Sequence, residues 1–171
     1  MSENLNPTTL EDEQGTPTQR LAHLGLELPV AAKPSFDYIP VTRFGHIMYV
    51  SGQLPKQGGE VLITGRCGEG VSIEQAQHAA EICVLQGLAC AADAAGGLDN
   101  ISNVLRVTGF VASTHDFHDQ PKVLDAARSL LRKIFGDSGR HARSALGVTS
   151  LPRKSPVEIE FIFSTKDPVA T

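Results

Sequence analysis

The sequence predicts an α+β fold in which a mixed β-sheet carries two helices packed on one face. Two long segments, about residues 72–96 and 119–136, repeat apolar residues at helical spacing. Two apolar runs precede the first segment, one separates the segments, and two follow the second. Because no third long helix is available and the last run is apolar on both sides, we expect another subunit to cover the opposite sheet face.

The N-terminal residues are expected to form an arm in front of one domain. Residues 1–18 are rich in Asn, Pro, Thr, Glu and Asp, a composition typical of a flexible arm. We expect residues 19–166 to form a single domain and residues 167–171 a tail. Leucines at near-helical spacing predict a short helix over residues 20–26.

Short strands are predicted next. Residues 37–43 alternate weakly, residues 46–52 are strongly apolar, and Gly45 between them indicates a hairpin turn. Residues 57–60 read Gln-Gly-Gly-Glu, which predicts another turn, and residues 61–64 form a candidate short strand.

Both long helices have recognisable ends. Ser72, with Gln75 three positions later, forms a capping box, and Gly96 ends the first helix. Pro121 suits the first turn of the second helix, which should begin at residue 119 or 120, and Gly136 should end it.

The remaining strands are predicted over residues 101–114, 143–149 and 157–164. Strict alternation along the first of these gives two faces, with Val104, Arg106, Thr108 and Phe110 on one and Leu105, Val107 and Val111 on the other.

Composition argues against several classes of partner. The 171 residues are long enough for a substantial core, and their net charge of −4 gives no general attraction to a phosphate backbone. Aromatic residues make up only 5% and Trp is absent, so surfaces for stacking nucleic-acid bases are scarce. No apolar run approaches the roughly 18 residues of a membrane span, and the polar N-terminus has no signal-peptide core. We therefore expect a cytoplasmic protein with neither a membrane nor a nucleic-acid partner.

The three cysteines, Cys67, Cys83 and Cys90, match neither a zinc motif nor a disulfide framework. We interpret them as small apolar core residues in a reducing compartment.

Two residues near the C-terminus carry the clearest chemistry. Arg143 lies among Ala142, Ser144 and Ala145, so small neighbours leave its guanidinium free to take a carboxylate through two parallel bonds. Glu158 lies inside an apolar strand, where it can polarise a water molecule. The alternative is a structural salt bridge from Arg143 to Glu158 or to Glu160, which shares the face of Glu158.

Four blocks of sequence occur in an order and spacing that point to a known family: Tyr38 ahead of Val50-Ser51-Gly52-Gln53-Leu54-Pro55; Val107-Thr108-Gly109-Phe110-Val111; Ala142-Arg143-Ser144; and Leu151-Pro152 before Val157-Glu158-Ile159-Glu160. On these blocks, residues 36–164 resemble the YjgF/RidA family, whose members are also called endoribonuclease-like or translation-initiation-inhibitor-like proteins. The stretches at residues 119–123 and 139–144 are similar to its longer branch, which carries an N-terminal extension.

The resemblance implies a chorismate-mutase-like fold and a homotrimer with a central β-barrel and three pockets between subunits. It also implies cofactor-free hydrolysis of 2-imino or enamino acids to 2-keto acids and ammonia, with a small carboxylate-bearing metabolite as ligand. Arg143 matches the carboxylate-binding arginine, Glu158 the acid that handles the water, and Tyr38, Ser51 and Gly52 match positions in the pocket.

The chain departs from the deaminase pattern at two places. Ala145 stands where the deaminases have a cysteine, so we expect it to line the substrate site without that residue's contact. Residues 119–122 read Asp-Gln-Pro-Lys where a ligand-contacting Asn is usual. A pocket that senses a keto acid without catalysis, and the endoribonuclease or translation inhibitor of the older family names, are the alternatives.

Two further patterns are only weak signals of a metal site and of a phosphate-binding loop. The residues 115–119, His-Asp-Phe-His-Asp, lack a recognised metal-ligand spacing, so no metal site is expected and Asp116 or Asp119 is interpreted as a helix cap. The glycines of residues 65–70 lack the Lys-Ser/Thr of a phosphate loop and are interpreted as a flexible surface loop.

Overall fold

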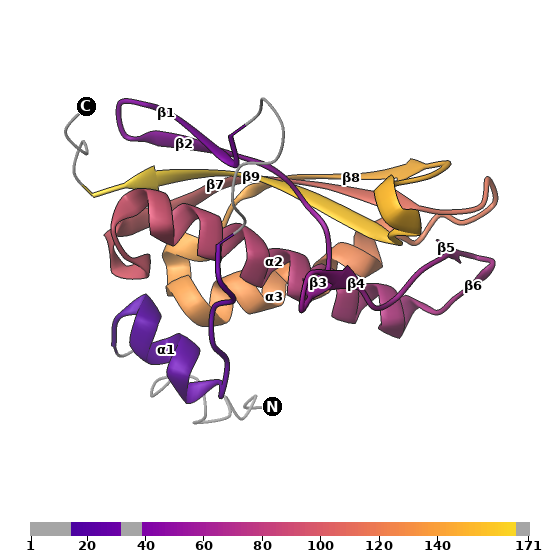
Figure 1. The fold of residues 1–171 in the computed structure, drawn as a ribbon, viewed down its shortest axis with the longest axis horizontal. Coiled ribbons are helices and arrows are strands. Elements are labelled where there is room, and N and C mark those ends of the chain that lie inside the picture. Colours follow the sequence, from indigo (N-terminus) through magenta and orange to yellow (C-terminus); the bar gives the residue numbers. More distant parts are fainter. Residues whose placement is uncertain (1–14, 32–38, 167–171) are drawn as a thin grey trace, which may run out of the picture.

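The computed structural model describes residues 15–31 and 39–166. Its main feature is a five-stranded mixed sheet in the order β1-β2-β9-β7-β8, with two long helices, α2 and α3, on one face (Figure 1). The predicted class of α+β fold, with both helices on the same side, is therefore confirmed.

The hairpin forms one side of the sheet. Strands β1 (Val41–Phe44) and β2 (Ile47–Gln53) pair antiparallel across a turn at Gly45, whose φ of 57° suits glycine. The predicted hairpin is confirmed, although β1 begins later than expected. A register shift between β2 and its other neighbour, β9, falls between Val50 and Gln53 and marks a bulge.

The other strands complete the sheet. Strand β9 (Val157–Thr165) is its centre and pairs antiparallel with β2 and with β7 (Ile101–Ala112). Strand β8 (Ala142–Val148) pairs parallel with β7 and forms the edge of the sheet opposite β1. The strict alternation predicted for β7 is wrong at one point. A second register shift, between Val104 and Arg106, places Val104 in the core with Val107 and leaves Leu105 exposed.

Helix α2 (Ile73–Ala95) begins and ends where the sequence predicts. The Ser72 hydroxyl accepts the amide hydrogen of Gln75, and the Gln75 side chain accepts that of Ser72, so the capping box forms in full. At the other end, Gly96 adopts the left-handed conformation with φ of 73°.

Helix α3 (Gln120–Phe135) buries its predicted apolar stripe: Val123, Leu124, Ala127, Leu130, Leu131 and Ile134. The prediction that an aspartate caps this helix is wrong for Asp119, which occupies the N-cap position but makes no side-chain cap bond. Its carboxylate instead lies 3.0 Å from the Lys122 ammonium, because its backbone is not in the extended conformation that capping needs.

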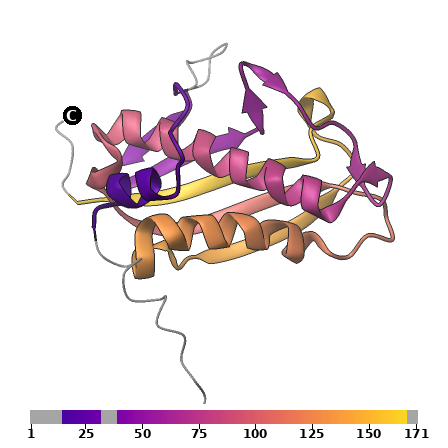
Figure 2. The same cartoon turned by 90° about the horizontal axis from the view of Figure 1, so that it is seen from below.

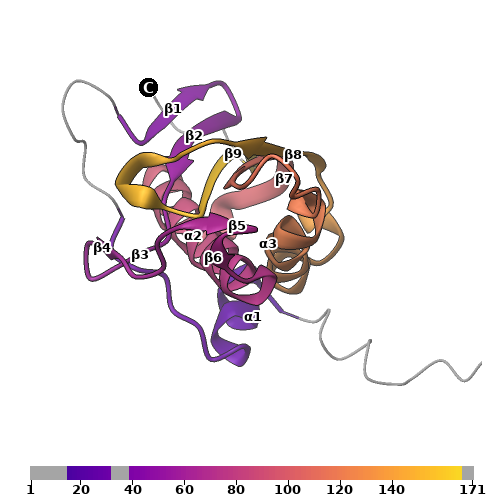
Figure 3. The same ribbon diagram turned by 90° about the vertical axis from the view of Figure 1, so that its right-hand side faces the viewer.

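The core lies between the sheet and the two helices, which run side by side across one sheet face (Figure 2). The Phe161 and Phe163 rings stack with centroids 5.5 Å apart beneath α2. Gly87 of α2 allows this close approach, since a Cβ there would overlap the Phe161 ring. Seen end-on, the sheet forms one layer and α2 with α3 the other (Figure 3).

The remaining elements are short. Helix α1 (Pro17–His23) begins three residues earlier than predicted and lies against α3 on the side away from the sheet (Figure 3). Strands β3 (Lys56–Gln57) and β4 (Glu60–Val61) form a small antiparallel ladder, where residues 61–64 were expected to be the strand. Strands β5 (Arg66–Cys67) and β6 (Gly70–Val71) lie in the stretch interpreted as a loop.

All three cysteines are buried and free, as the sequence predicts. Among the described residues, no helix combines the length and apolar character that crossing a membrane requires.

Candidate functional site

Glu158 lies on the open face of the sheet, the face that α2 and α3 do not cover. Alternation along β9 buries Val157 and Ile159 against the helices and turns Glu158 away from them. Its carboxylate sits directly over Gly52 of the neighbouring strand, where an added Cβ would overlap it. Gly52 is therefore bare because the Glu158 carboxylate occupies the space of a side chain.

The surroundings of Glu158 favour its protonated form. Burial raises the pKa of the Glu158 carboxyl above its ordinary value, and the nearby Glu160 carboxylate raises it further. The Lys56 ammonium acts in the opposite direction and does not reverse the shift. A carboxyl group with a raised pKa in a partly buried position is suited to exchange protons with a bound water.

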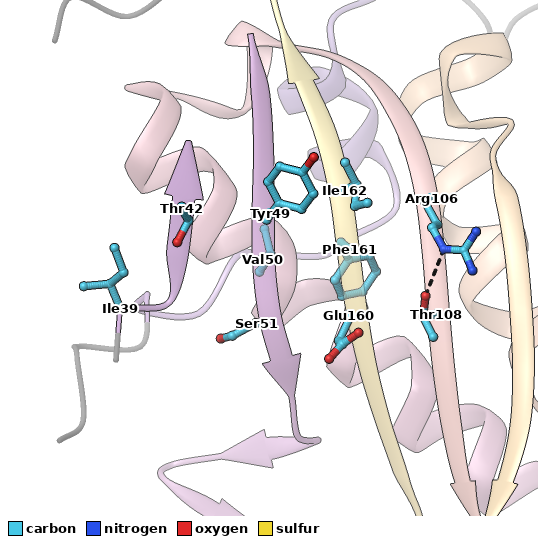
Figure 4. A pocket seen from close by; sticks show the side chains of 10 residues that line it. All are labelled: Ile39, Thr42, Tyr49, Val50, Ser51, Arg106, Thr108, Glu160, Phe161 and Ile162. Carbon is cyan, nitrogen blue, oxygen red and sulfur yellow. Dashed lines mark hydrogen bonds between the residues drawn. The ribbon is translucent and has the colours of Figure 1, made fainter. Parts of the chain in front are cut away.

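A hollow of about 380 Å³ lies next to this position on the open face (Figure 4). Ser51, Glu160 and Arg106 line it. The Arg106 Nε donates to the Thr108 hydroxyl at 3.3 Å, and its Nη2 donates to the Ser144 hydroxyl at 2.9 Å. The hollow combines both charge signs with hydroxyl groups. Its other lining residues are Ile39, Thr42, Tyr49, Val50, Phe161 and Ile162.

Arg143 lies elsewhere, on the helix side of the edge strand β8. Its Nη1 donates to Oδ1 of Asp125 on α3 at 2.9 Å, and its side chain is 25% exposed. This hydrogen bond is the main reason that the pKa of Asp125 lies below its ordinary value. The alternative salt bridge from Arg143 to Glu158 or Glu160 is therefore wrong, since the carboxylate that pairs with Arg143 belongs to the helix.

Ala145 lies two residues along β8 and faces the same side as Arg143, where it packs against the core. Gly147 follows at the same spacing, and the amide of Gln120 together with the Ser113 hydroxyl fills the space that a side chain there would take. Small residues thus follow Arg143 on the helix-facing side of β8.

The predicted site residues therefore form two groups within one chain. Ser51, Gly52 and Glu158 lie together on the open face, whereas Arg143 and Ala145 lie on the helix side of the β8 edge. Tyr38 lies outside the described residues.

Sequence reasoning missed Asp125. No motif marks this residue, because its partner on β8 is 18 positions away and the pairing depends on how α3 packs.

Within residues 15–31 and 39–166, no three side chains of His, Cys, Asp or Glu converge as a metal site would require. Around residues 115–119, a hydrogen bond from the Thr114 side chain lowers the pKa of Asp116, and Asp119 pairs with Lys122.

The sequence of residues 18–164 matches a family model described as "YjgF/chorismate mutase-like, putative endoribonuclease". The chain belongs to the YjgF family. The mixed sheet with two helices on one face is the YjgF/chorismate-mutase-like fold, as the resemblance implied.

Two curated relatives are similar to this chain over most of its length. Protein TCP17 of Trypanosoma cruzi is 37% identical over 147 residues, which are 85% of this chain and 92% of the relative. A 2-iminobutanoate/2-iminopropanoate deaminase of Dermatophagoides farinae is 28% identical over 137 residues, 80% of this chain and 92% of that protein.

Solved YjgF-family structures agree in fold. A protein of unknown function from Agrobacterium tumefaciens is 42% identical with a TM-score of 0.81, and the match covers 88% of this chain and 92% of that one. A structure from Shewanella oneidensis, described as "a putative endoribonuclease", is 31% identical with a TM-score of 0.84, and the match covers 88% of this chain and 99% of that one.

Proposed function

We propose that this protein hydrolyses a small 2-imino or enamino acid to a 2-keto acid and ammonia, without a cofactor, in a pocket between subunits. The observation that carries the proposal is the Glu158 carboxyl over Gly52, with a raised pKa, beside a polar hollow. The deaminase relative from Dermatophagoides farinae supports this choice of reaction within the family.

The reaction requires a water molecule, a group that transfers protons and a group that binds the substrate. In the proposed reaction, Glu158 takes a proton from a water molecule while the water oxygen bonds to the imine carbon. That proton passes to the imine nitrogen, which gives a carbinolamine. The hydroxyl proton then passes through Glu158 to the amino nitrogen, the carbon–nitrogen bond breaks as the carbonyl forms, and ammonia leaves. Arg143 holds the substrate carboxylate through parallel hydrogen bonds, which fixes the imine carbon in front of the water.

A second copy of the chain would be required to unite these groups. Arg143 and Glu158 lie on opposite sides of the sheet, and β7 separates their strands. Strand β8 lies at an edge of the sheet, and the open face exposes apolar side chains such as Tyr49 and Leu146, at 51% and 44%. We propose that three chains associate through these surfaces, forming a central barrel, with Arg143 of one chain meeting Ser51, Gly52 and Glu158 of the next.

Non-catalytic binding of a keto acid is the second candidate, and one observation favours it. Ala145 lies two residues from Arg143 on the same side of β8, and its side chain has no polar atom. It therefore cannot form a hydrogen bond to the part of the substrate that reacts. In this case the protein would bind 2-keto acids saturably and release them unchanged.

The experiment that tests the proposed function generates imino acids in place with an amino-acid oxidase and follows keto-acid formation. Wild type should accelerate hydrolysis, whereas Arg143→Ala should fall to the uncatalysed rate while remaining folded. Arg140→Ala is the matched control, since Arg140 is an exposed arginine three residues earlier. Equal rates with and without folded wild-type protein, over a panel of imino acids, would overturn the proposal and leave the binding role.

A further inference from the structure

Most of the Arg143 guanidinium remains available despite its ion pair. Only Nη1 donates, to Asp125 Oδ1 at 2.9 Å, and this is the one hydrogen bond of Arg143 within the described part of the chain. Nε and Nη2 lie on one edge of the planar group and suit a carboxylate with two parallel bonds. Asp125 therefore holds the arginine from the helix side without occupying the edge that a ligand would use.

Asp125 also sets the local charge. Nε of Arg128, one turn further along α3, lies 3.5 Å from the same Oδ1, so two guanidinium groups share one carboxylate. His141 is the other titratable group beside them, and burial, with help from both arginines, lowers its pKa. With His141 neutral, the cluster of Arg143, Arg128, Asp125 and His141 carries a single positive charge.

We propose that Asp125 is a specificity-determining residue, which cancels one of the two arginine charges and so restricts the site to ligands with a single carboxylate. The inference depends on the proposed function of Arg143 as the carboxylate-binding group. It goes further by assigning to Asp125 the discrimination between ligands with one and with two carboxylates.

The selectivity follows from electrostatics. A monocarboxylate neutralises the cluster, whereas a dicarboxylate leaves a surplus negative charge that the Asp125 carboxylate repels. Asp125 is 47% exposed, so solvent weakens this repulsion, and at separations of several ångströms it amounts to roughly a tenfold preference.

Binding of two keto acids, 2-oxobutanoate and 2-oxoglutarate, tests the inference without requiring turnover. Their dissociation constants would be measured by NMR titration on wild type, Asp125→Asn and Arg128→Gln. Asparagine keeps the oxygen that accepts from Arg143 and removes only the charge. The ratio of the two constants within each variant cancels differences in ligand size.

We expect Asp125→Asn to shift this ratio roughly tenfold towards the dicarboxylate and Arg128→Gln to shift it in the opposite direction. A merely structural role would change both affinities together and leave the ratio unaltered, which would overturn the inference. If folded Asp125→Asn bound neither keto acid, the inference would be overturned as well. Arg143→Ala separates the two proposals, because unchanged binding in that variant would refute the role of Arg143 itself.

Discussion

Arg143 and Glu158 lie on opposite faces of one sheet, with strand β7 between the strands that carry them. Arg143 faces α3 and pairs with Asp125, while Glu158 lies over Gly52 on the face that no helix covers. Because of this separation, the proposed chemistry requires a neighbouring copy of the chain.

Substitution of Gly52 by alanine should damage the site far more than the fold. The new methyl group would overlap the Glu158 carboxylate, which must move, and a displaced water-handling group is expected to lose roughly 100-fold in rate. Gly45→Ala is the control, because it lies in open space with φ of 57° and should cost about 1 kcal/mol of stability with activity retained. Comparable rates for Gly52→Ala and wild type would show that the contact does not matter for catalysis.

Glu160 should tune the ionisation of its neighbour. Because the Glu160 carboxylate raises the pKa of Glu158, Glu160→Gln should lower that pKa, while burial keeps it above the ordinary value. A ¹³C NMR titration of the glutamate carboxyl carbons in the two proteins would measure the change. An unchanged Glu158 titration in the variant would remove Glu160 from the electrostatics of the site.

Glu158 should also weaken the fold at neutral pH. Its folded-state pKa is raised, so the cost of ionisation is absent below the unfolded value of 4.5 and develops as pH rises through the folded value. Glu158→Gln should therefore match wild type in free energy of unfolding near pH 4 and exceed it near pH 7. Urea denaturation at both pH values provides the measurement, and a constant difference across the range would contradict the expected linkage.

The two long helices offer a matched test of capping. Ser72→Ala removes a hydroxyl that accepts the Gln75 amide and should cost about 1 kcal/mol of stability. Asp119→Ala removes a residue that makes no cap bond and loses only a surface ion pair with Lys122, so it should cost about 0.5 kcal/mol or less. Thermal unfolding of both variants measures the two losses of stability. An equal loss in each would indicate that Asp119 does cap α3.

Local sequence signals predicted those parts of the fold that local interactions determine. The Ser72 capping box, the left-handed Gly96 and the apolar stripe of α3 all act over a few residues, and each appears as predicted. The bulge near Val104 was missed because a register shift depends on the neighbouring strand β9.

The site was predictable only in part, for the same reason. The family blocks predict Arg143, Glu158, Ser51 and Gly52 as site residues, but not the faces of the sheet on which they lie. The Asp125 partner of Arg143 could not be found from spacing, because an ion pair between a helix and an edge strand exists only after both have packed. The same holds for Glu158 over Gly52, which depends on the pairing of β2 with β9.

The most direct test of the central claim mixes two inactive variants. Arg143→Ala and Glu158→Gln chains, carrying different tags, would be co-expressed, and assemblies containing both would be purified and assayed for imine hydrolysis. If each pocket takes Arg143 from one chain and Glu158 from the next, every mixed trimer regains one intact pocket of three. Its rate should therefore reach about one third of wild type. Mixed assemblies as inactive as either variant alone would contradict a site shared between subunits.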